Sequence, residues 1–176
     1  MKRLVSPTPA VLLLVAPLAF SASSGATGPP PEGLPPARKI PGLTAPDTHP
    51  KGCVDCHIRY PEHKLDEPFS TLMAGWTTKV DAGLLKKAQA AAPAGVTLKG
   101  KHPQTPLGTK DIPRSCLGCH AKASKTAPPF AQMIHLIHLT GGDQNRFLGV
   151  FQGECTLCHK LDTATGRWVM ASGPEM

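Results

Sequence analysis

Apolar side chains recur at helical spacing in two stretches of the chain. In the first stretch they occupy every fourth position, at Leu72, Trp76, Val80 and Leu84. Because residues four apart share one face of a helix, this pattern predicts a helix over about 68–91. Asp66 and Pro68 fit a capping carboxylate and a first-turn proline at its start. The helix can break near Gly75 or Gly83, since glycine is a weak helix former.

A second, shorter helix is expected after the prolines at 128–129. Its apolar side chains fall on one side at helical spacing: Phe130, Met133, Ile134 and Ile137. Gly141-Gly142 closes it, because glycine readily adopts the conformation in which helices end. No segment alternates convincingly as a strand, and the tail 161–176 shows no clear pattern. The patterning therefore predicts a mainly α fold with much irregular loop and no substantial sheet.

The chain begins with three features in the order of a secretory signal. Residues 1–3 form a short basic start, an apolar run covers 10–20, and small residues follow over 21–26. An uncleaved membrane anchor is disfavoured because the run is about half the roughly 20 residues needed to span a bilayer, and Pro17 interrupts it. We predict that 1–24 is a cleaved signal peptide. The mature protein is then periplasmic, cell-surface or extracellular, of bacterial type, with no integral membrane segment.

Composition changes after the signal. Residues 25–46 hold seven prolines and are predicted to form a proline-rich linker, which leaves 47–176 as one folded domain. Proline and glycine make up 37 of the 176 residues, and only 5% of residues are aromatic. A chain this poor in large apolar side chains would struggle to build a core from its own residues. The composition favours a fold built around a large apolar cofactor.

One short motif occurs three times and uses all six cysteines of the chain. Its copies are Cys53-Val-Asp-Cys56-His57, Cys116-Leu-Gly-Cys119-His120 and Cys155-Thr-Leu-Cys158-His159. Cys-x-x-Cys-His is the haem attachment signature of c-type cytochromes. Two thiols at this spacing can form thioethers with the vinyl groups of one porphyrin, and the adjacent histidine can coordinate its iron. We therefore predict three covalently bound haem c groups, with His57, His120 and His159 as proximal iron ligands.

Two other kinds of site also use paired cysteines. A structural zinc site usually closes with two Cys-x-x-Cys pairs, and three pairs do not divide into such sites without recruiting histidines. A disulfide framework suits an exported protein. However, disulfides within Cys-x-x-Cys are redox-active, and no thioredoxin-like βαβ pattern surrounds these motifs. The histidine after every second cysteine, together with the export signal, favours haem.

Each haem needs a second axial ligand. Five histidines lie outside the motifs: His49, His63, His102, His135 and His138. His135 and His138 are about 60° apart around the predicted helix, so one helix can give a ligand to each of two haems. His102 is the third expected distal ligand. His49 and His63 compete with it, although His63 is better explained as a surface residue. The pairings cross the sequence and stay open.

The axial ligands indicate the kind of chemistry. Methionine would raise the reduction potential, but Met73 and Met133 lie on apolar faces of the expected helices, where packing explains them better. Iron with two imidazole ligands has no vacant position for a substrate. The sequence therefore predicts a carrier of electrons through low-potential haems, not an enzyme. The alternatives are a small multihaem reductase with one open-site haem, and a conducting subunit of a cytochrome assembly.

The formal net charge of +7 does not indicate nucleic-acid binding. Lys2 and Arg3 leave with the signal, and the propionates of three haems offset most of the remaining charge. The lysines are also scattered along the sequence, with Lys86-Lys87 as the one adjacent pair. No basic block of the kind that nucleic acids require stands out.

The second motif is followed by Phe-Ala-Gln-Met-Ile-His-Leu-Ile-His, from Phe130 to His138, and then by the third motif. This order resembles a unit of the outer-surface multihaem cytochromes of metal-reducing bacteria. The resemblance covers 116–159 and implies that His135 and His138 are distal ligands. With the spacing, it suggests a close haem pair within 116–159 and a first haem apart. Redox proteins, other multihaem cytochromes or an extracellular acceptor are the expected partners.

Overall fold

The computed structural model describes residues 37–104 and 110–175. The predicted signal peptide and the first part of the predicted linker lie outside the described residues. A compact unit begins at Ala37, so the last ten residues of the expected linker belong to it. They form a turn in which the amides of residues 43–45 donate to the carbonyl oxygen of Ile40, at 2.9 to 3.1 Å.

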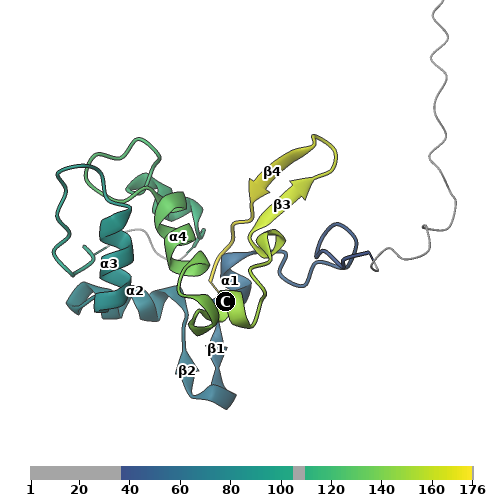
Figure 1. The fold of residues 1–176 in the computed structure, drawn as a ribbon, viewed down its shortest axis with the longest axis horizontal. Helices are drawn as coiled ribbons and strands as arrows, with labels where there is room; N and C mark the ends of the chain where they lie inside the picture. The colour runs from purple at the N-terminus through teal and green to yellow at the C-terminus, as the bar shows by residue number, and fades with distance from the viewer. Residues whose placement is uncertain (1–36, 105–109, 176) are drawn as a thin grey trace, which may run out of the picture. The chain divides into compact units, whose positions relative to one another are not determined.

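The long helix expected over 68–91 is two helices, α2 (Phe69–Thr78) and α3 (Ala82–Ala90) (Figure 1). The break falls between the two glycines that the pattern singled out, but neither glycine makes it. Asp81 does, because its carboxylate accepts hydrogen bonds from two amides in the first turn of α3, at 2.7 and 3.2 Å. The chain therefore turns at a new N-cap rather than at a weak helical residue.

The start of α2 is capped by a residue that is distant in the sequence. The expected cap from Asp66 is wrong, because Asp66 lies in a strand and makes an ion pair with Arg59 at 3.5 Å. Instead the amide and hydroxyl of Ser70 donate to the carboxylate of Glu175, at 3.1 and 2.7 Å. Two residues earlier, Gly173 exchanges backbone hydrogen bonds with Ile112 at 2.8 and 3.0 Å. The C-terminal segment thus joins α2 to the loop before the second motif.

The shorter predicted helix is confirmed as α4 (Phe130–Leu139). It ends at Thr140, and Gly141 follows with a φ of 104°. Helix α3 packs against α4 (Figure 1), and the next helix is α5 (Arg146–Gly149).

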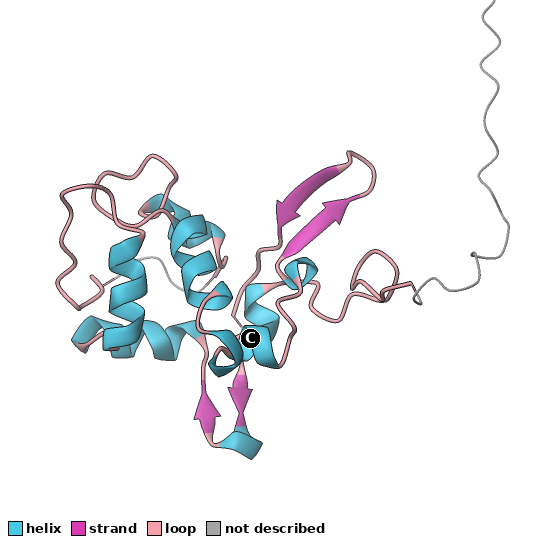
Figure 2. Cartoon of the chain, in the orientation of Figure 1, coloured by secondary structure: helices cyan, strands magenta, loops and turns pink. Residues whose placement is uncertain are grey.

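The strands form two small antiparallel hairpins (Figure 2). Strands β1 (Arg59–Tyr60) and β2 (Leu65–Asp66) flank a 3₁₀ turn, and β3 (His159–Asp162) pairs along its length with β4 (Arg167–Met170). The expectation of no substantial sheet is confirmed. The tail, which showed no clear pattern, nevertheless forms the second hairpin. Asp162 closes its turn by accepting hydrogen bonds from three groups of the loop.

Few apolar side chains are buried in the described part of the chain: Val54, Ala91, Ile112, Phe130 and Leu157. Val54 and Leu157 are variable positions of the first and third motifs, while Ile112 and Phe130 flank the second. The core therefore lies at the three motifs rather than between the long helices. Among the described residues, no helix is long and apolar enough to cross a membrane.

Candidate haem-binding sites

Each Cys-x-x-Cys-His motif folds into a single helical turn. The first is the short helix α1 (Cys53–Cys56), and the other two are 3₁₀ turns. The amide of His57 donates to the carbonyl of Cys53 at 2.9 Å, and the amide of His120 donates to that of Cys116 at 3.0 Å. Because side chains three apart on such a turn lie on the same side, both thiols of a motif can reach one flat group.

All six cysteines carry free thiols. The thiols of Cys53 and Cys158, which belong to the first and third motifs, are hydrogen-bonded to each other. This hydrogen bond and burial raise the pKa of the Cys53 thiol, and burial raises the pKa of Cys56 to about 11. The attachment points of the first and third motifs therefore lie side by side, although about 100 residues separate them.

Three of the five histidines outside the motifs each meet one motif histidine. Ring centroids lie 6.2 Å apart for His57 and His138, 6.0 Å for His120 and His102, and 6.0 Å for His159 and His135. These six residues are the proximal and distal ligands that the sequence predicts. Each pair joins one motif to one histidine from elsewhere, and no histidine is shared between pairs.

The separation of the rings fits a metal held between them. An imidazole nitrogen binds a first-row metal at about 2.0–2.1 Å, which puts the metal about 3.2 Å from the ring centroid. Two imidazoles on opposite sides of one metal thus have centroids about 6.3 Å apart. Rings in direct stacking contact would be closer, at about 4.5 Å at the lower end of the range for aromatic pairs. The observed 6.0 to 6.2 Å is compatible with an iron between the rings. Ordinary ring pairs such as His49 and Phe151, at 6.0 Å, have the same spacing, so the matching of each motif histidine with one distal histidine is the stronger observation.

Hydrogen bonds hold four of the six rings in the tautomer that binds metal. The Nδ1–H groups of His57 and His138 donate to the carbonyl oxygens of Glu67 and Ile134, at 3.2 and 3.0 Å. The rings of His120 and His102 do the same with two prolines, at 2.7 and 2.8 Å. A ring that donates from Nδ1 keeps the lone pair on Nε2 for a metal and is fixed in orientation. This partner was not anticipated for any of the four.

Burial favours the neutral form of three of the six paired imidazoles, by its effect on their pKa values. Burial lowers the pKa of His57 to about 4, and burial also lowers the pKa values of His138 and His159. The ring of Phe69 lies 4.2 Å from that of His57, and the ring of Phe147 lies 5.6 Å from that of His138. A neutral ring is the form that coordinates a metal.

The helices α2 and α3 position His102. Its amide donates to the carbonyl of Trp76 at 2.8 Å, and the amide of Val80 donates to the carbonyl of Gly100 at 2.8 Å. The side chain of Gln89 holds the same loop through Val96 and Leu98, at 2.7 and 2.8 Å. The segment 66–102, for which no family pattern was found, therefore builds the support of one candidate ligand.

The two competing histidines lie away from the pairs. The side chain of His63 is 65% exposed at the turn of the first hairpin. His49 bonds through Nδ1 to the hydroxyl of Thr48 at 2.9 Å, and its ring meets Phe151 edge-on at 6.0 Å. Neither ring meets a motif histidine in the ring contacts of the described residues.

The structure gives each histidine pair, which the sequence left open. Helix α4 directs His135 towards the third motif and His138 towards the first, whereas the second motif takes its partner from the loop at His102. The contact between Cys53 and Cys158 agrees with this arrangement. The first and third motifs thus lie side by side, while the close haem pair that spacing suggested within 116–159 stays a prediction.

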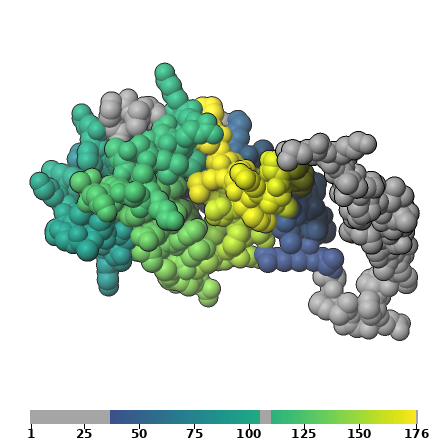
Figure 3. Space-filling model, turned by 90° about the horizontal axis from the view of Figure 1, so that it is seen from above, coloured from purple at the N-terminus to yellow at the C-terminus, as the bar shows by residue number. Residues whose placement is uncertain are grey.

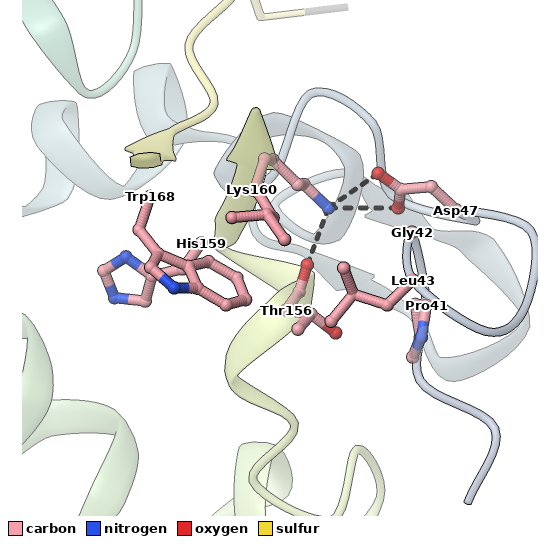
Figure 4. Close-up of a pocket in the computed structure, with 9 residues that line it drawn as sticks. Pro41, Gly42, Leu43, Asp47, Thr156, His159, Lys160 and Trp168 are labelled. Carbon is pink, nitrogen blue, oxygen red and sulfur yellow. Dashed lines mark hydrogen bonds and ion pairs between the residues drawn. The ribbon is translucent and has the colours of Figure 1, made fainter. Parts of the chain in front are cut away.

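A small cavity of about 70 Å³ lies next to His159 (Figure 4). The ammonium of Lys160 crosses it and meets both carboxylate oxygens of Asp47 at 3.0 Å and the carbonyl of Thr156 at 2.8 Å. Trp168 and Leu43 also line it. Ligand pockets usually measure about 300–1,000 Å³, so this cavity is too small to bind a ligand of ordinary size. We interpret it as a packing gap between the turn near residue 40 and the third motif.

Comparison of the chain with protein-family models, curated proteins and solved structures gives no match. In the described residues, no cluster of three or more His, Cys, Asp or Glu side chains is placed to hold a metal ion.

Proposed function

We propose that the protein is an exported trihaem c-type cytochrome that carries electrons between redox partners. The observation that carries the proposal is the one-to-one meeting of three motif histidines with three distal histidines at 6.0 to 6.2 Å. A motif alone predicts attachment. A second imidazole at the metal-bridging distance also predicts the coordination.

The cysteines and the histidines of each site have different roles in binding a haem. The two cysteines of each motif would attach it covalently, and the two paired histidines would bind its iron. When bound, haem supplies an iron that gains or loses one electron. The imidazoles leave no open position for a substrate and stay the same in both oxidation states. The hydrogen bonds from Nδ1 to backbone carbonyls limit ring movement between those states.

The contacts between sites suggest an order of exchange. Cys53 contacts Cys158, and α4 supplies both His135 and His138. The first and third sites are therefore adjacent and share this helix. The second site joins the same helix at its other end, where the amide of Phe130 donates to the carbonyl of His120 at 2.9 Å. We propose that electrons pass between the second site and the first and third sites along α4.

The test is to purify the protein from a host that matures c-type cytochromes. We expect a mass increase of three haems that survives denaturation, and low-spin spectra in both oxidation states. A chain without covalent haem would overturn the proposal. A high-spin, carbon monoxide-binding haem in the native protein would replace it with the reductase alternative, which needs one iron with an open position.

A further inference from the structure

Basic residues gather around one of the three histidine pairs. The segment 92–128, which contains His102 and His120, holds six basic residues and one acidic residue, Asp111. The basic residues are Lys99, Lys101, Lys110, Arg114, Lys122 and Lys125. The rest of the described chain is almost balanced, with eleven basic residues against ten acidic ones. The excess positive charge of the described chain therefore belongs mainly to the segment that carries this pair.

The fold closes this segment into a loop. His102 and His120 lie close together, with ring centroids 6.0 Å apart and planes 20° from parallel. Four of the lysines lie within five residues of one of these histidines, so each Cα is within roughly 18 Å of the ring pair, given the reach of an extended chain. In Figure 3 the teal and green segments that carry the two histidines lie together at the surface. All six basic residues are exposed.

The same site also reaches the surface. Cys119 is exposed, as is Cys155 of the third motif, but only the second motif has an exposed apolar side chain, Leu117, which keeps 44% of its surface exposed. The corresponding positions of the other two motifs, Val54 and Thr156, are 0% and 6% exposed. The attachment edge of the second site therefore faces solvent, with an apolar spot surrounded by positive charge.

We propose that this patch, the basic residues of 92–128 around Leu117 and Cys119, is the docking surface for an acidic redox protein. The inference rests on the proposed function. A partner with carboxylates around its own redox centre would be drawn to the patch by long-range attraction and held there by apolar contact. The second site would then be the point where electrons enter or leave the chain.

The charge pattern fits a protein partner better than other anionic partners. The segment 92–128 contains no Phe, Tyr or Trp, so it lacks the side chains on which nucleic-acid bases stack. It also contains no α-helix in its described part, whereas a helix with one apolar face is the usual means of entering a bilayer surface. The one exposed apolar side chain of the motif suits a small, transient protein contact.

The test compares two variants with the same change of charge. K99E/K101E/K122E alters the patch, and K39E/K64E/R167E alters exposed basic residues elsewhere. Both holoproteins are mixed in stopped flow with a reduced plant-type ferredoxin, as an acidic protein probe, at several salt concentrations. At low salt, we expect ferredoxin to reduce the patch variant at least about tenfold more slowly than the parent protein. The rate for the control variant should stay within about twofold of the parent rate.

Other outcomes decide against the patch. Equal slowing of both variants would show an effect of net charge alone and would overturn the inference. So would selective loss of binding to anionic phospholipid vesicles in the patch variant, with unchanged reduction by ferredoxin. A parent protein without covalent haem would instead contradict the proposed function. Hexaammineruthenium, a cationic probe, should not lose rate with the patch variant.

Discussion

The three imidazole pairs differ in the angle between their ring planes. The planes of His57 and His138 are nearly perpendicular, at 84°, whereas those of His102 and His120 are 20° apart. Perpendicular rings leave two iron d orbitals close in energy, which increases the anisotropy of a low-spin ferric signal. Parallel rings separate these orbitals. The pairs therefore predict haems that can be told apart by spectroscopy.

We expect the electron paramagnetic resonance spectrum of the oxidised protein to contain at least two low-spin signals. One should be highly anisotropic, from the pair of His57 and His138, and one should be ordinary and rhombic, from the pair of His102 and His120. The variant H138A should lose the anisotropic signal and keep the other. Three identical signals in the parent protein would contradict the ring arrangement.

His102 is the distal residue that the sequence supported least among the three predicted. The variant H102A removes one ring of a pair without touching a motif, and so should convert one haem of three to a high-spin form. The measurement is the optical and magnetic spectrum of the oxidised protein. H63A is the matched control, because that side chain is 65% exposed, and it should keep all haems low-spin. A low-spin spectrum in H102A would exclude His102 as a ligand.

The sequence predicted the six paired residues but left their pairing open. Spacing and residue type identify a ligand, because the chemistry needs a particular side chain. The pairing of His57 with His138 joins positions 81 residues apart, and only the packed chain determines it. The hydrogen bonds from Nδ1 were also missed, since they end on backbone carbonyls, which every residue carries.

At the level of elements, α4 is fastened at its C-terminal end. The side-chain amide of Asn145 donates to the carbonyls of Ile137 and Thr140, at 2.7 and 2.9 Å, while its oxygen caps α5 at the amide of Phe147. Lys87 of α3 donates to the same two carbonyls, at 3.2 and 3.3 Å. These bonds satisfy carbonyls that a helix end leaves without partners. They also fix the helix that carries two candidate ligands.

We expect N145A to lower the free energy of unfolding of the holoprotein by about 1–3 kcal/mol, from the lost cap and two lost hydrogen bonds. Guanidinium unfolding followed by circular dichroism measures it. The neighbouring Gln144 is exposed, so Q144A should change the stability by less than about 0.5 kcal/mol. An equal loss of unfolding free energy in the two variants would show that the hydrogen bonds of Asn145 do not stabilise the end of α4.

The elements that the sequence predicted well are those with a local cause. The apolar stripe and Gly141 sufficed for α4. The cap of α2 comes from Glu175, about 100 residues away, so no local pattern could reveal it. The hairpin of β3 and β4 was missed because only four residues form each strand. The sequence Arg-Trp-Val-Met and the turn residues Asp162 and Gly166 were the available signals.

For the whole molecule, the distribution of buried side chains matters most. Five apolar residues are buried in the described chain, and two of them lie inside motifs. Larger side chains are left exposed, among them Trp168 at 54% and Val150 at 68%. A cooperative fold of this length needs more buried apolar surface than that, because ordering the backbone has a large entropic cost. The proposed haems would supply the missing apolar surface.

We therefore expect the chain to fold only with its haems attached. The mature sequence produced without haem, with its thiols kept reduced, should show weak helical circular dichroism and no cooperative thermal transition. The holoprotein should melt cooperatively. The variant C116S/C119S tests an intermediate case. It should lose the second haem, and the loop at His102 should become less ordered. The first and third sites share α4 and the contact of Cys53 with Cys158, so they should keep their low-spin spectra. A haem-free chain that melts as cooperatively as the holoprotein would show that the protein builds its core from its own side chains.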